Sequence, residues 1–209
     1  MRNFLLRLSV YSFLIFSILN CSATQKTADS ANAFTTEIKN QYFSDKEQEY
    51  FYRTQIEVYG NEITGMLIVK KIAENTHRIV MTGDFGNKML DAEITASEFK
   101  INYIVAGLDR SVVKKVLEKD FRTLVNESYS ATEISSDKTH DVYRAFDKKN
   151  GFELHFEKAS GILTQIIVTE NGREQSFFSF EAKNPIFADW IEIRHQDIRL
   201  NILLKSIKE

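Results

Sequence analysis

The sequence of 209 residues contains one cysteine and one proline, and its formal net charge is only −2. A single cysteine excludes a disulfide within the chain and excludes zinc sites built from paired thiols. The near-neutral charge argues against a nucleic-acid partner, because a phosphate-binding surface needs a clear basic excess. The sequence also has no glycine-rich phosphate loop and no nucleophile elbow. It therefore indicates a protein that is not an enzyme and needs no cofactor.

The four histidines are scattered along the chain and share no metal-ligand spacing: they are His77, His140, His155 and His195. His155 alternates with Glu153 and Glu157, which places all three on one face of an expected strand. This set could hold a metal ion, but two carboxylates and one imidazole are also common on a solvated strand face. We therefore predict no metal site.

The N-terminal stretch has the pattern of an exported lipoprotein. Arg2 and Arg7 precede an apolar run over residues 8–19, which is too short for a membrane span and typical of a signal peptide over residues 1–20. Residues 18–21 read Ile-Leu-Asn-Cys and look like a lipobox, although the usual pattern has leucine at the first position and a small residue before the cysteine. We expect Cys21 to be lipidated; the alternative is an incidental cysteine.

The residues after Cys21 predict a tether and then one domain. Residues 21–32 are small and polar and read as a flexible linker, followed by a single domain over residues 33–209. No acidic run follows the cysteine, and by resemblance to known sorting signals this favours an outer-membrane anchor with the domain facing the periplasm.

Apolar periodicity predicts two helices and many strands in the domain. Helical spacing predicts helices over residues 33–49 and 109–125, the second capped by Asp109. Strand-like runs occupy residues 50–59, four segments between 62 and 106, and residues 127–136, 139–147, 151–158, 162–170, 174–183, 188–195 and 197–207. Asn171-Gly172 predicts a two-residue hairpin. We therefore predict a mainly β (α+β) fold, a large curved antiparallel sheet that forms an unclosed half-barrel with helices covering its concave side.

Two of the central strands are apolar on both faces. In residues 63–69 and 79–81 both alternating positions carry apolar side chains, so a helix layer, a second sheet or a ligand cavity must cover the second face. One interpretation is a cavity for acyl chains between sheet and helix; the other is a core filled by its own side chains. The candidate cavity-lining residues are Met66, Ile68, Ile79, Met81, Val113, Leu117 and Phe121.

A phenylalanine stands at the tip of an expected hairpin turn. Residues 83–87 read Gly-Asp-Phe-Gly-Asn, a composition suited to a tight reversal. A hairpin tip is normally solvated, so Phe85 either folds back onto the sheet or is displayed to a partner.

The order of these elements resembles the LolB and LolA family of lipoprotein receptors and carriers. The segments that carry the resemblance are residues 65–69, residues 78–81 with the turn at 83–87, Met89-Leu90, and the closing hairpin of residues 190–193 and 198–202. The resemblance implies an unclosed barrel with a helical lid, whose apolar hollow accepts lipoprotein acyl chains from a periplasmic LolA-like carrier. It also implies that Phe85 assists insertion of the cargo into the membrane. A lipid-anchored sensor module and a structural accessory of an outer-membrane complex remain as alternatives.

Overall fold

A computed structural model describes residues 35–207, which lie within one compact unit, Ala33–Glu209. The signal peptide predicted over residues 1–20, the tether of residues 21–32 and the lipidation site Cys21 lie outside the described residues.

The described chain forms one antiparallel sheet of 13 strands, accompanied by one α-helix. In chain order the elements are β1 (Thr36–Lys39), β2 (Glu49–Val58), β3 (Asn61–Ala73), β4 (Thr76–Gly83), β5 (Lys88–Ile94), β6 (Phe99–Ile104), α2 (Ser111–Val125), β7 (Ser128–Ser136), β8 (His140–Asp147), β9 (Asn150–Glu157), β10 (Leu163–Glu170), β11 (Arg173–Ala182), β12 (Ala188–His195) and β13 (Leu200–Ser206). Every strand predicted after residue 50 occurs within a few residues of its expected bounds.

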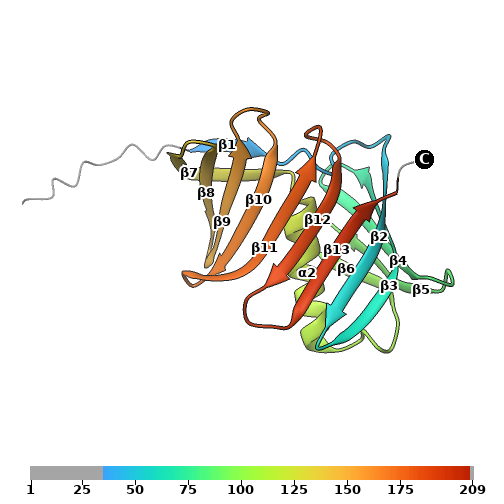
Figure 1. The fold of residues 1–209 in the computed structure, drawn as a ribbon. Coiled ribbons are helices and arrows are strands. Elements are labelled where there is room, and N and C mark those ends of the chain that lie inside the picture. Colours follow the sequence, from blue (N-terminus) through green and yellow to red (C-terminus); the bar gives the residue numbers. More distant parts are fainter. Residues whose placement is uncertain (1–34, 208–209) are drawn as a thin grey trace, which may run out of the picture. The chain divides into compact units, whose positions relative to one another are not determined.

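Two meanders and the short edge strand β1, which pairs with β7, make up the sheet. Strands β2 to β6 form one and β7 to β13 form the other, and each strand within them pairs with its neighbour in sequence. The meanders are joined where β13 pairs with β2, from Leu200 opposite Val58 to Ser206 opposite Tyr52 (Figure 1). The edge strands are β1 and β6, and no pairing among the described strands joins them. The predicted curved, unclosed sheet is confirmed.

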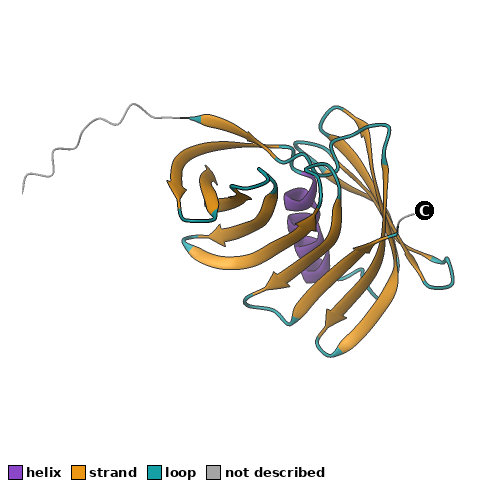
Figure 2. Ribbon diagram, turned by 45° about the horizontal axis from the view of Figure 1, so that its top comes forward, coloured by secondary structure: helices purple, strands orange, loops and turns teal. Residues whose placement is uncertain are grey.

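The helix α2 lies inside the curve of the sheet (Figure 2). It connects β6, at one edge, to β7, which is next to the other edge, and it buries Leu117, Phe121, Leu124 and Val125. This stripe recurs at helical spacing, so the predicted helix is confirmed. The predicted cap is wrong: the N-cap is Arg110, which makes no side-chain capping bond, and Asp109 instead pairs with Lys114 at 2.6 Å.

The helix predicted over residues 33–49 is wrong. Residues 36–39 form β1, which pairs with β7, and the chain then crosses the domain in an irregular segment of residues 40–48. Phe43 has a φ of 63°, which is incompatible with a right-handed helix. Tyr42 and Phe43 are buried because they anchor this crossing: the Tyr42 hydroxyl donates to the Leu163 carbonyl at 2.7 Å, and its ring stacks on Phe180. Their spacing in the sequence therefore reflects burial by distant parts of the chain and not the period of a helix.

The Asn171-Gly172 hairpin is confirmed. Both residues have positive φ, 51° and 76°, as a type I′ turn between β10 and β11 requires.

The two apolar faces of β3 and β4 have different surroundings. Leu67 and Val69 of β3 are buried with their β4 partners on the face that carries the core. Met66 and Ile68 alternate with them and therefore lie on the opposite face, where they are only half-buried. No second layer of described residues covers that face, so the expectation of a covering layer on both sides is wrong for β3.

A buried aspartate braces the β4–β5 hairpin on this outer side. The Asp91 side chain is 4% exposed and accepts hydrogen bonds from Arg78 Nε and Nη2 at 3.1 and 2.9 Å and from Lys88 Nζ at 3.0 Å. The bonds from Arg78 are the main reason that the pKa of Asp91 falls from 3.8 to about 2.

We expect Asp91→Asn to lower the free energy of unfolding by about 2 kcal/mol at pH 7, the value of a pKa shift of this size. Because the folded-state pKa is depressed, this contribution is fully present above pH 3.8 and is lost as the pH falls through about 2. Urea unfolding at pH 7 and at pH 2 measures it, and the difference between the two proteins should be large at pH 7 and small at pH 2. Glu98→Gln, at an exposed position in the next hairpin, is the control and should change little at either pH.

Candidate functional site

A partly enclosed cavity of about 680 Å³ lies beside the C-terminal half of α2. Its wall combines this part of the helix, the start of β7, the β4 and β5 residues near Asn75 and Ile94, and the ends of β8 to β12. The larger apolar lining side chains are Ile94, Val116, Val125, Tyr129, Phe146, Phe152, Val168 and Ile198. The charged lining residues and histidines are His77, Lys119, Asp120, Arg122, Glu127, Asp147, Glu170, His195 and Asp197. The cavity therefore combines apolar and charged surface.

None of the seven predicted lining residues borders this cavity. Four of them are buried in the core between helix and sheet, namely Ile79, Met81, Leu117 and Phe121. Val113 is half-buried against the same core, and Met66 and Ile68 lie on the outer face of β3. The structure brings the core residues together as a self-filled packing layer and places the open space further along α2.

The apolar wall is built mainly by β7, β9 and β10. Phe152 of β9 stands opposite Val168 of β10, and its ring lies 5.1 Å from that of Tyr129 on β7. The Tyr129 hydroxyl donates to the Thr123 carbonyl at 3.2 Å, which ties this wall to the helix. The wall is therefore preformed by strand pairing and by a link to α2.

A buried histidine–aspartate pair borders the cavity on its other side. His195 Nε2 lies 3.0 Å from Asp120 Oδ1, and His195 Nδ1 lies 3.1 Å from the Leu200 carbonyl, so both ring nitrogens face acceptors. Burial alone would lower the pKa of His195, but the hydrogen bond and charge of Asp120 outweigh it and the pKa is raised. Burial also raises the pKa of Asp120, and the hydrogen bond and charge of His195 oppose this rise. Because the two side chains are in direct contact at 3.0 Å, the geometry favours an imidazolium paired with a carboxylate.

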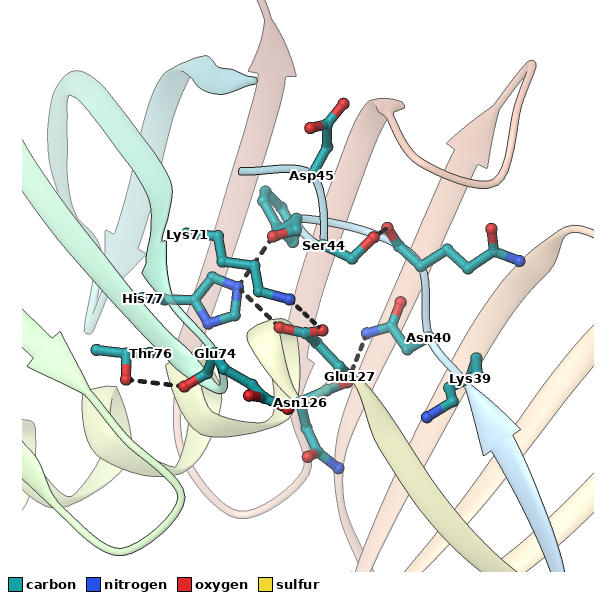
Figure 3. Close-up of polar contacts among 12 residues, drawn as sticks. Lys39, Asn40, Ser44, Asp45, Lys71, Glu74, Thr76, His77, Asn126 and Glu127 are labelled. Atoms are coloured by element: carbon teal, nitrogen blue, oxygen red, sulfur yellow. Dashed lines mark hydrogen bonds and ion pairs between the residues drawn. The ribbon is translucent and has the colours of Figure 1, made fainter. Parts of the chain in front are cut away.

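A second polar cluster closes the end of the helix (Figure 3). Glu127 Oε2 pairs with Lys71 Nζ at 2.6 Å, and Glu127 Oε1 lies 3.7 Å from Nε2 of the buried His77. His77 Nε2 also lies 2.9 Å from the Phe43 carbonyl. Burial lowers the pKa of His77, which favours the neutral ring. This cluster links β3, β4, the crossing segment and the short connection between α2 and β7.

Asn40 fastens the crossing segment to the last turn of α2 (Figure 3). Its Nδ2 donates to the carbonyls of Leu124 and Asn126 at 3.3 and 3.1 Å, and its Oδ1 accepts from the Tyr42 backbone N–H at 3.1 Å. Carbonyls at a helix C-terminus have no partner within the helix, so a buried asparagine that bonds to them stabilises this end. The crossing segment thus closes one end of the helix layer.

The Phe85 side chain is fully exposed at the tip of the β4–β5 hairpin. The turn is held by hydrogen bonds between Gly83 and Asn87 and between Gly86 and Gly83, both of 2.9 Å. Asp84 accepts a hydrogen bond from Arg53 Nη1 at 3.1 Å and another from the Thr64 hydroxyl. A braced turn therefore displays an apolar ring to solvent.

The histidine of the predicted solvated strand face does not build a metal site. His155 lies 3.8 Å from Glu153 and its ring is 6.3 Å from that of His140. Among residues 35–207, no group of three or more metal-binding side chains has a suitable arrangement. No helix within the same residues is long and apolar enough to cross a membrane.

Sequence reasoning missed Asp120, His195 and Asn40. Asp120 and His195 are 75 residues apart, and Asn40 reaches α2 across 84 residues, so no local spacing connects them. The one available signal was Asp120 itself, a carboxylate that interrupts the apolar stripe of α2 immediately before Phe121.

Comparison with known proteins identifies the fold. No family model and no curated protein sequence matches the chain. A LolA superfamily protein from Nitrosomonas europaea has a similar structure, with a TM-score of 0.54 and 8% identity, covering 77% of this chain and 83% of that chain. An outer-membrane lipoprotein-sorting protein domain from Vibrio parahaemolyticus gives a TM-score of 0.46 and 7% identity over 77% and 83% of the two chains. The first of these similarities shows a LolA-like fold.

Proposed function

We propose that this protein is a lipid-anchored, LolB-type receptor that accepts acyl chains of lipoproteins in the cavity beside α2 and helps to insert them into the outer membrane. The observation that carries the proposal is a cavity of about 680 Å³, walled by Phe152, Val168 and Tyr129, between the helix and an unclosed sheet.

The size and chemistry of the cavity support this role. Its volume falls within the range of roughly 300–1,000 Å³ typical of ligand sites. Each methylene buried in such a site contributes on the order of 0.8 kcal/mol, so transfer between a carrier and a receptor needs no covalent chemistry. The LolA-like fold is consistent with a periplasmic LolA-like carrier as the donor of cargo, and Cys21 supplies the membrane anchor in this proposal.

The full chain carrying Cys21→Ser, which removes the lipidation site, tests the proposal directly. Organic extraction followed by mass spectrometry should find acyl species in near-stoichiometric amount. The uncharged probe N-phenyl-1-naphthylamine should show enhanced fluorescence with the protein and be displaced by long-chain alcohols. A protein that carries no acyl species and does not bind the probe would contradict the proposal.

Phe85 is the proposed membrane-insertion residue. We expect Phe85→Glu to leave the fold intact, because the side chain contacts nothing, and to reduce incorporation of lipoproteins into membranes about tenfold. The reason is that an inserted phenylalanine contributes about 1.5–3 kcal/mol, which the charged residue removes. Incorporation into vesicles by the purified protein measures the effect.

The matched control for this prediction is Val112→Glu, which changes another exposed apolar side chain, on the first turn of α2. It should incorporate lipoproteins normally. Equal activity of the Phe85 variant and wild-type protein would remove Phe85 from the proposed mechanism.

The display of Phe85 on a braced turn also suits a protein contact, so docking to an outer-membrane complex is the second candidate function. In that case Phe85→Glu would remove one stoichiometric partner from the purified protein, whereas acyl binding would be absent in both proteins.

A further inference from the structure

Asp120 carries a carboxylate oxygen without a hydrogen-bond partner. The side chain is 2% exposed and belongs to the wall of the cavity. Its Oδ1 is occupied by His195 Nε2, but no described group bonds to the buried Oδ2. A buried carboxylate oxygen is costly to leave unpaired, so a donor group that reaches it from a ligand is strongly favoured.

The other charges of the cavity point to the sign of this ligand. The basic lining residues Lys119 and Arg122 are already paired, Lys119 with Glu170 at 2.7 Å and Arg122 with a glutamate on its own helix at 3.1 Å. Asp147 and Asp197 line the cavity at exposed positions, and neither forms an ion pair within the described part of the chain. An anionic headgroup would find no uncommitted cation, whereas a cationic one is attracted.

We propose that the cavity accepts an amphiphile whose headgroup carries a primary ammonium, and that Asp120 Oδ2 accepts a hydrogen bond from this ammonium. The inference rests on the proposed function, because the acyl chain would occupy the apolar wall of Phe152 and Val168. His195 holds the first carboxylate oxygen, and the second has no hydrogen-bond partner among the described residues.

Three amphiphiles of equal chain length test the preference in the full chain carrying Cys21→Ser. Dodecylamine, dodecanol and dodecanoate are titrated at pH 7 against bound N-phenyl-1-naphthylamine. We expect dodecylamine to displace the probe at about tenfold lower concentration than dodecanol, since charge-assisted hydrogen bonds are stronger than neutral ones. Dodecanoate should be the weakest competitor.

Two variants assign the preference to its residue. Asp120→Asn replaces the unpaired acceptor by an amide group of the same shape, and it should abolish the advantage of the amine while dodecanol still displaces the probe. Asp147→Asn removes a charge from the rim of the same cavity and should keep most of the advantage. Thermal unfolding confirms that each variant is folded, and if Asp120→Asn does not fold, the preference of the unsubstituted cavity decides alone.

The outcomes separate the two proposals. Equal displacement by all three amphiphiles would overturn the ammonium inference and leave the acyl-binding function standing. Failure of all three would contradict the acyl-binding function itself. If Asp147→Asn loses the preference for dodecylamine as fully as Asp120→Asn does, the preference comes from the negative charge of the cavity in general. Asp120 Oδ2 would then not be the specific acceptor.

Discussion

Replacing Gly65 by alanine is expected to lower the free energy of unfolding by about 3–5 kcal/mol, the upper range for a single substitution in a packed site. Gly65 lies in β3 opposite Gly83 of β4, and a Cβ atom at this position would stand 1.9 Å from the Thr82 carbonyl oxygen. This neighbour is backbone, so relief requires the two strands to separate. The same movement would disturb the adjacent turn, because the Thr64 hydroxyl bonds to Asp84.

Gly107→Ala is the matched control for this substitution. Gly107 lies between β6 and α2, an added Cβ would meet no atom within 4 Å, and its φ is not in the left-handed region. We expect the free energy of unfolding to change by less than about 1 kcal/mol. Urea unfolding of both variants measures the difference, and a Gly65 variant as stable as the control would show that β3 and β4 can separate without cost.

Asn40→Ala is expected to lower the free energy of unfolding by about 2–4 kcal/mol. The substitution removes three hydrogen bonds at once, two of them buried, and leaves the Leu124 and Asn126 carbonyls without this partner. Because these bonds fasten the crossing segment to α2, the loss should also appear locally. Backbone amides of the last helical turn should exchange with deuterium faster than the same amides in the unsubstituted protein, whereas amides in the middle of the helix should change less.

The neighbouring substitution Gln41→Ala provides the control, because Gln41 is exposed and both of its described hydrogen bonds, from the backbone N–H and the hydroxyl of Ser44, are accepted by its backbone carbonyl. It should leave both stability and exchange unchanged. If Asn40→Ala resembles Gln41→Ala in both measurements, the bonds to the helix end contribute nothing to stability.

The strands of the sheet could be predicted from the sequence because each is determined by a pattern of neighbouring residues. Alternation of apolar and polar side chains and turn residues such as Asn171-Gly172 fix each strand and its reversal over a few positions. Since almost every strand pairs with its neighbour in the chain, the order of most of the sheet follows from these signals. The helix predicted over residues 33–49 failed because Tyr42 and Phe43 are buried by partners far along the chain.

The location of the cavity could not be predicted from local sequence patterns. In β3 both faces are apolar at the centre, so sequence cannot tell whether Leu67 or Met66 faces the helix. A prediction of burial also does not tell whether a side chain packs in the core or lines a cavity. Phe121 and Asp120 are both buried, but only Asp120 lines the cavity. The pairing of Asp120 with His195 depends on the curvature of the whole sheet, which no local pattern contains.

The pairing of β13 with β2 also sets the order in which the domain can mature. Strand β13 follows every other described strand in the chain, yet it lies between β12 and β2 in the middle of the sheet. Until β13 is synthesised, the two meanders can begin to fold locally, but no strand pairing joins them. The pairs that join them, such as Val58 with Leu200, lie far apart in the chain. Closure of such long-range contacts is slow. A nascent chain therefore stays incompletely folded until its final strand has been synthesised, so the free energy of the whole sheet depends on the last residues to be added.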